Sequence, residues 1–230
     1  TAKKMFNADG WVINHTTDVF GRTGVHDSVQ CGFFPMAGPW LCINLWEQYE
    51  FTNDINILKD IYPVLKGSCE FIKDFLIEGE DGYLVTNPSN SPENNFYYID
   101  ENGNKKKSMF TYGATIDFEI IDALFARTIY ACRVLENDES FIKNLEEILS
   151  KLPPLKVSER YGTIQEWIKQ GVQMPKCPSL DISLCQDCKM CVKLCPTNAI
   201  DPLTLDTDSE KCIKCCACVK GCVFHARFMP

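Results

Sequence analysis

The sequence predicts a mainly α-helical protein that ends in a small, cysteine-rich domain. Two observations indicate this: apolar residues recur with helical spacing through most of the chain, and ten of the 14 cysteines fall in its last quarter. The charge changes at the same place, since residues 1–170 carry 16 Lys and Arg against 25 Asp and Glu, whereas residues 171–230 carry 7 against 6. We therefore expect a helical segment over residues 1–170, a linker over residues 171–182 and a second domain over residues 183–230.

Four helices are expected in the first segment from apolar spacing, capping residues and prolines. In chain order they are residues 40–49 behind Gly38 and Pro39, residues 62–77 with Pro63 in the first turn, residues 116–135, and residues 139–152 with Asn137 or Asp138 as the cap. Residues 83–86 are expected to form a short strand. The Asn, Pro and Ser-rich stretch 87–108 predicts a long connection, of the kind that carries function on a rigid scaffold.

The composition excludes two classes of protein. No apolar run approaches the ~20 residues of a membrane span. The net charge is −8 and the basic residues are scattered, which argues against nucleic-acid binding, and Lys105 to Lys107 are expected to form a solvated loop.

The start at Thr1 shows no secretory signal pattern, so we expect a truncated N-terminus.

The cysteine-rich part contains one four-cysteine pattern twice, with an offset of 27 residues at every cysteine. Three closely spaced thiolates followed by a fourth that serves the other centre is the arrangement of two-cluster iron–sulfur proteins. The spacing assigns two [4Fe-4S] clusters, the first held by Cys185, Cys188, Cys191 and Cys222, the second by Cys195, Cys212, Cys215 and Cys218. Two alternatives fit the cysteines less well. A disulfide scaffold would need a secreted context, which no signal in the sequence supports, and zinc sites use two pairs of cysteines at wider spacing than is found here.

Cys177, Cys216 and His225 lie outside this pattern and are expected to have packing or structural roles. Residues 181–228 resemble bacterial two-cluster ferredoxins, most closely the modules attached to redox proteins of anaerobes. One departure is Val223, where those proteins usually have proline. The resemblance implies a small α+β ferredoxin-like domain, low-potential one-electron transfer to an unknown redox partner protein, and a reducing, cytoplasmic setting.

Six motifs in the first segment resemble glycoside hydrolase family 95. They are GWVINHTTD (10–18), FFPMAGPWL (33–41), LWEQYEFT (45–52), YPVLKG (62–67), NPSNSPEN (87–94) and IQEW (164–167). The members of this family are α-L-fucosidases. The resemblance implies a partial (α/α)6 barrel built from helical hairpins over residues 1–170, with a sugar pocket at one end, and inverting hydrolysis of terminal α-L-fucosides.

The resemblance places the general acid of that reaction at Glu93, where neighbouring aromatic rings would raise the pKa of the carboxyl group. It implies sugar contacts at Trp11, His15 and Asp18, although the residues themselves equally allow a hydrogen-bonded histidine and a turn aspartate. The family's water-activating Asn and Asp residues fall outside the matching stretch, so we expect the chain alone to be inactive. Other aromatic and acidic residues are expected in the core or in solvent: Trp40, Trp46 and Trp167 in the core, Asp117 and Glu119 in solvent.

Three functions remain open at this point. The first is electron transfer by the two-cluster domain, joined to an incomplete α-L-fucosidase-like segment. The second is an inverting α-L-fucosidase that acts on a fucosylated glycan with Glu93 as its acid. The third is a gene-model or assembly fusion of two unrelated proteins, because glycoside hydrolysis uses no electrons.

Overall fold

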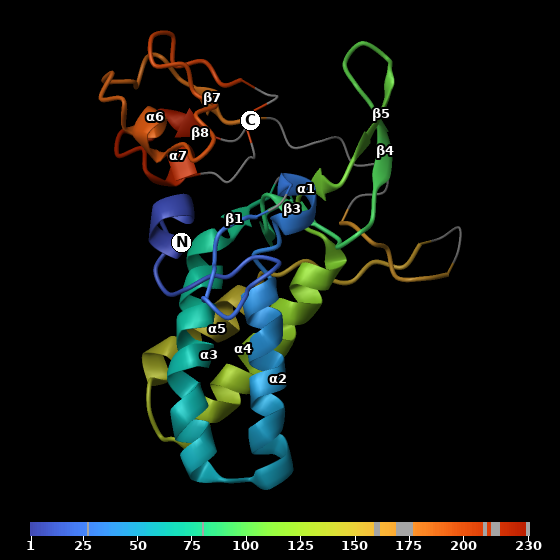
Figure 1. Cartoon of the computed structure of the whole chain (residues 1–230), viewed down its shortest axis with the longest axis vertical. Helices are drawn as coiled ribbons and strands as arrows, with labels where there is room; N and C mark the ends of the chain where they lie inside the picture. The colour runs from blue at the N-terminus through green and yellow to red at the C-terminus, as the bar shows by residue number, and fades with distance from the viewer. Residues whose placement is uncertain are drawn as a thin grey trace.

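The structure, a computed structural model, describes most of the chain. The described ranges are residues 1–26, 28–79, 81–158, 162–168, 177–208, 211–212 and 217–228. A helical body comes first in the chain, and a small cysteine-rich module lies at one end of it (Figure 1).

Four long helices form the body. They are α2 (Ala37–Thr52), α3 (Ile55–Phe75), α4 (Thr115–Val134) and α5 (Glu139–Ser150). Helices α2 and α3 form a tight hairpin, α4 packs against both, and α5 packs against α4 (Figure 1). Asn53 makes the sharp turn of that hairpin with a left-handed φ of 52°. Packed hairpins of this kind agree with a helical-barrel segment.

The expected helices are found, with one correction. Helix α3 begins at Ile55 rather than at residue 62, because Asp54 caps it by accepting a hydrogen bond from the N–H of Asn56 at 2.8 Å. Pro63 therefore lies inside the helix and not in its first turn. Asp138 precedes α5 as expected, but its carboxylate accepts hydrogen bonds from Tyr62 and from Lys66 Nζ instead of capping the helix.

The core of the body is rich in phenylalanine. The rings of Phe6, Phe71 and Phe75 lie within 5.4 Å of one another, measured between centroids, and all three side chains are fully buried. Phe6 belongs to η1 (Ala2–Phe6), a short π-helix at the N-terminus, so this segment packs against α3. Each buried side chain of this size stabilises the fold by roughly 1.5–3 kcal/mol.

Short antiparallel strands surround one end of the helices. The pairs are β1 (Ile77–Glu78) with β2 (Leu84–Val85), β3 (Ser89–Asn90) with β6 (Phe110–Thr111), and β4 (Phe96–Ile99) with β5 (Lys105–Ser108). A single helical turn, α1 (Val29–Gly32), precedes α2. The strand expected at residues 83–86 is confirmed as β2. The connection 87–108 contains a β-hairpin as well as loops, and its three lysines are exposed on β5.

The cysteine-rich module contains β7 (Ser179–Leu180), α6 (Met190–Leu194), α7 (Ala217–Lys220) and β8 (Arg227–Phe228). Strands β7 and β8 pair antiparallel, so the end of the expected linker is part of the module. The linker residues 171–176 lie outside the described residues. Helices α6 and α7 approach so closely that a Cβ on Gly221 would lie 2.0 Å from Leu194 Cδ1.

The module makes a small contact with the body. Ala217 of α7 is buried in the same apolar cluster as the phenylalanines of η1 and α3, and Leu194 packs against that cluster. Lys220 Nζ lies 5.9 Å from the centroid of the Phe75 ring. Within the described parts of the chain, no helix has the length and apolar character to cross a membrane.

Trp11 fills the space between α2 and α3. A Cβ added to Gly38 or Gly67 would lie 2.7 Å from an atom of its indole ring, and its Nε1 donates a hydrogen bond to the carbonyl of Val64 at 2.9 Å. The two glycines therefore leave room for one aromatic ring between the helices.

We expect Gly67→Ala to destabilise the protein, because the new methyl group would overlap the indole of Trp11. The free energy of unfolding, measured by urea denaturation, should fall by about 1–3 kcal/mol. Gly24→Ala is the control, since nothing lies within 4 Å of a Cβ at that position. Equal stability of both variants would contradict this account of the packing.

Candidate functional sites

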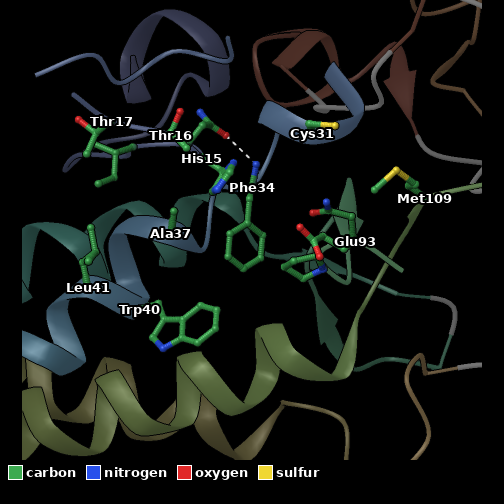
Figure 2. A pocket seen from close by; sticks show the side chains of 14 residues that line it. His15, Thr16, Thr17, Cys31, Phe34, Ala37, Trp40, Leu41, Glu93 and Met109 are labelled. Atoms are coloured by element: carbon green, nitrogen blue, oxygen red, sulfur yellow. Dashed lines mark hydrogen bonds between the residues drawn. The ribbon is translucent and has the colours of Figure 1, made fainter. Parts of the chain in front are cut away.

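A cavity of about 590 Å³ opens where the N-terminal segment, the start of α2 and the loop after β3 meet. This volume is typical of small-molecule sites. Its lining includes His15, Phe34, Trp40, Asn90, Glu93 and Met109 (Figure 2). The cavity thus combines two aromatic rings with a carboxyl group, an amide and an imidazole.

Glu93 reaches the cavity from the loop that follows β3 (Figure 2). The residue is exposed, and its backbone has a left-handed φ of 62°, which is uncommon for a residue with a Cβ. Asn94, the next residue, donates a hydrogen bond to Glu166 Oε1 at 2.8 Å, and Ser91 donates to the same oxygen. Glu166, from the IQEW motif, therefore anchors the loop through the residues on either side of Pro92 and Glu93.

A buried carboxyl group anchors the start of the same loop. Asp117 in the first turn of α4 accepts hydrogen bonds from Thr86 Oγ1 at 2.6 Å and from Ser89 Oγ at 2.7 Å. The expectation that Asp117 faces solvent is wrong: its side chain is buried, whereas Glu119 is exposed as expected. Burial raises the pKa of Asp117 to about 7, although the two hydroxyl donors oppose the shift.

The opposite wall comes from the N-terminal segment. The buried Asn14 accepts a hydrogen bond from the N–H of Phe34 at 3.1 Å and donates to the carbonyl of Thr23 at 3.2 Å. This amide fixes the backbone beside His15, whose own side chain is exposed at the cavity (Figure 2).

Two residues that the family resemblance suggested as sugar contacts do not line this cavity. Trp11 is held between the two glycines of α2 and α3 described above. Asp18 accepts a hydrogen bond from the N–H of Phe20 at 2.9 Å and forms an ion pair with Arg22 Nε at 3.0 Å. Its contacts are those of a turn aspartate, the alternative that the sequence left open.

Two other residues line the cavity: Trp40, whose expected place in the core is wrong, and Asn90, to which the sequence assigned no role. Trp40 is 47% exposed, and its ring packs edge-on against Phe34 with 6.3 Å between centroids. Asn90 is buried, and its Oδ1 has no hydrogen-bond partner among the described residues. This oxygen is a buried acceptor without a described partner, on a residue that lines the cavity. The adjacent SPEN motif was the signal that could have drawn attention to Asn90.

A second, small cavity lies in the cysteine-rich module. Four cysteines contribute to its lining, and they are the set that spacing assigned to the first cluster: Cys185, Cys188, Cys191 and Cys222. Cys222 follows the other three at a long distance in sequence, yet the pairing of β7 with β8 brings it to the same cavity. The residues present therefore fit a group that needs four thiolates around one centre. No three described His, Cys, Asp or Glu side chains are close enough together to hold a single metal ion.

Hydrogen-bond donors and one cation lie close to the sulfur atoms of this cavity. The N–H of Asp187 points at Cys185 Sγ, with 3.4 Å between N and S, and Arg227 Nη2 lies 3.9 Å from Cys191 Sγ. Burial opposes ionisation of Cys222, but the N–H groups of Arg227, Phe224 and Ala226 and the charge of Arg227 hold the pKa of its thiol below the usual value.

The second predicted set is described only in part. Cys195 Sγ accepts a hydrogen bond from the N–H of Ala199 at 3.1 Å, and Cys218 is buried on α7. Cys212 is half-buried, whereas Cys215 and the extra Cys216 lie outside the described residues. The assignment of Cys195, Cys212, Cys215 and Cys218 to a second cluster stays a prediction.

Comparison with known proteins finds two different families in the chain. Residues 1–176 match the glycosyl hydrolase family 95 catalytic domain, and residues 178–201 match a 4Fe-4S binding domain. Alpha-L-fucosidase 2 of Arabidopsis thaliana is 36% identical over 170 residues, and probable alpha-fucosidase A of Aspergillus niger is 28% identical over 173 residues. Each match covers 73% of this chain but only 20% and 21% of the respective relatives, so the chain spans about a fifth of their length.

We expect Asp117→Asn to reduce the pH dependence of stability. The pKa of Asp117 is about 7 in the folded protein against 3.8 for the ordinary group, so folding favours the protonated form. The stabilisation is complete below about pH 4 and is lost as the pH rises through about 7. Urea denaturation between pH 5 and pH 8 should therefore show a smaller loss of stability in the variant. Asp122→Asn, at an exposed position of α4, should behave as the wild type; an unchanged slope in Asp117→Asn would refute the assignment.

Proposed function

The chain belongs to glycosyl hydrolase family 95 through residues 1–176, and from this premise we propose that it joins a fucosidase-like segment to an electron-transfer module with two [4Fe-4S] clusters. The match to a 4Fe-4S binding domain covers the first four-cysteine run, and the second run repeats its spacing. The module would exchange electrons with a redox partner protein in a reducing, cytoplasmic setting.

The observation that carries this proposal is the convergence of Cys185, Cys188, Cys191 and Cys222 on one cavity. A cluster bound there would supply one-electron redox chemistry. The chain's own residues bind it through sulfur, donate N–H groups to that sulfur, and limit water with the apolar side chains of Leu180, Leu205 and Phe224. In the proposed second set, the N–H of Ala199 does the same for Cys195.

The open cavity of the helical body favours a second function, the hydrolysis of terminal α-L-fucosides. We propose that Glu93 protonates the leaving oxygen, that Trp40 offers its exposed ring to the apolar face of a sugar, and that His15 and Asn90 bind hydroxyl groups. Inversion also needs a base about 6.5–9.5 Å from the acid. Glu93 is the only carboxylate among the described residues that line this cavity, so the base must come from elsewhere.

The third alternative, a fusion of two unrelated proteins by gene-model or assembly error, makes a different claim about the contact between the parts. Unrelated parts have no reason to share an apolar cluster. The burial of Ala217 together with residues of η1 and α3 therefore supports one product. A peptide that crosses residues 165–185, detected by mass spectrometry of the native protein, would identify that product directly.

After anaerobic reconstitution we expect the full chain to bind about eight iron and eight sulfide ions, as two [4Fe-4S] clusters require. Cys188→Ser should lose about half of this iron or more, because Cys188 lines the cavity of the first set. Cys177→Ser, outside the repeat, is the matched control and should load fully. About four iron ions in the wild type would contradict the second cluster, and none would contradict the module.

For the helical body, if the wild-type chain hydrolyses a chromogenic α-L-fucoside, we expect Glu93→Gln to lower the rate by at least about 100-fold, because the leaving oxygen loses its acid. The iron content should stay unchanged. Glu101→Gln is the control, at an exposed position between β4 and β5. A wild-type chain without any hydrolysis would exclude fucosidase activity of this chain and would leave the iron–sulfur proposal untouched.

A further inference from the structure

Arg227 is a buried cation in the cysteine-rich module. Its side chain lies on β8 and is only 3% exposed. The guanidinium group is held by neutral oxygens: Nη1 donates to Thr207 Oγ1 at 2.9 Å and to the carbonyl of Pro178 at 3.4 Å, and Nη2 donates to the carbonyl of Leu205. Its Nε has no hydrogen-bond partner among the described residues. The orientation of the group is thus fixed, and no carboxylate of the described residues forms an ion pair with it.

A buried charge without an opposite charge is costly. None of the ion pairs formed by described residues of the module involves Arg227; they join Lys189 to Asp187 and Lys211 to Asp208. The remaining neighbour of the guanidinium is the cavity of Cys185, Cys188, Cys191 and Cys222, which Arg227 itself helps to line. Nη2 donates a long hydrogen bond to Cys191 Sγ at 3.9 Å. Among the described residues that line this cavity with Arg227, the four cysteines are those whose sulfurs would carry negative charge once a cluster is bound.

The internal repeat offers a comparison within the same chain. The offset of 27 residues that relates the cysteines also relates Ala226 to Ala199, and it places Ile200 at the position equivalent to Arg227. Ile200 is buried to the same extent, at 3% exposure. Arg227 follows Cys222 of the first set by five residues, as Ile200 follows Cys195 of the second. One set of thiolates thus has a buried cation beside it where the other has an aliphatic side chain.

We propose that Arg227 raises the reduction potential of the cluster held by Cys185, Cys188, Cys191 and Cys222, and so separates it from the potential of the second cluster. In the reduction step, a low-potential one-electron donor gives one electron to the cluster, whose charge becomes more negative by one. No bond to Arg227 is made or broken. A fixed cation in a low-dielectric interior stabilises the more negative state. The inference rests on the proposed two-cluster function.

The test compares the reduction potentials of both clusters in the full-length, reconstituted protein. Potentials are measured by anaerobic titration with dithionite, followed by electron paramagnetic resonance, after iron and sulfide analysis of each sample. Arg227→Ile introduces the residue found at the equivalent position 200. In this variant we expect one potential to fall by at least 59 mV, which corresponds to a tenfold change in the equilibrium constant of a one-electron reduction. The other potential should stay in place. Arg227→Lys keeps the charge and should recover most of the shift.

Lys193→Met is the matched control, because it removes an exposed positive charge from α6 in the same module. Water and salt screen such a charge, so both potentials should change much less than in Arg227→Ile. Thr207→Val removes an anchor of Arg227 and keeps the cation, so it should leave the potentials close to those of the wild type.

Loss of the anchoring hydrogen bonds could prevent Arg227→Ile from binding iron, and Arg227→Gln then decides, since it keeps N–H donors and lacks the charge. A loaded neutral variant with wild-type potentials overturns the inference. If neither neutral variant loads iron, loading of Arg227→Lys supports a role for the charge, whereas its failure assigns Arg227 a structural role and overturns the inference. A wild-type chain that binds no iron is a different result, because it refutes the proposed function itself.

Discussion

The buried carboxyl group of Asp117 holds together the part of the body on which the larger cavity depends. It receives hydrogen bonds from Thr86 and Ser89, so the chain on both sides of Pro88 is tied to the first turn of α4. The N–H of Gly113 donates to the carbonyl of Thr86, and the N–H of Ala114 donates to Ser89 Oγ; both hydrogen bonds are 2.9 Å long and reinforce this junction. The loop that carries Asn90 and Glu93 therefore begins at a rigid point, and a long helix determines where its side chains lie. The cost of burying the carboxyl group is visible in its raised pKa.

The helices could be predicted from the sequence, because apolar spacing and capping residues act locally. The start of α3 could not be predicted in this way. Proline is common in the first turn of a helix, so Pro63 indicated a start near residue 62, whereas the helix begins earlier, behind Asp54. Asp117 was misjudged for a related reason. An acidic residue in a first helical turn looks solvated until the loop with Thr86 and Ser89 folds over it.

Cysteine spacing and one loop motif were enough to select residues that the structure brings to the two cavities. Cysteine spacing alone selected the four side chains that share one cavity, even though Cys222 comes from a later part of the chain. The SPEN motif located Glu93 in the same way. Trp40 and Arg227 had no such signal: a tryptophan in a helix is usually core, and a single arginine forms no pattern. Only the packing of α2 beside the cavity and of β8 beside the thiolates gives these two side chains their surroundings.

The contact of α7 with the helical body has a consequence for how the chain divides. Composition changes near residue 170, yet Ala217 belongs to the same apolar cluster as residues of η1 and α3, and Lys220 lies over Phe75. A contact between side chains therefore crosses the boundary in composition. If the chain were cut there, Ala217 would lose its place in the cluster of the body, and Phe75 would lose the neighbouring cation of Lys220. Separating the two parts would therefore change the surroundings of side chains in both of them.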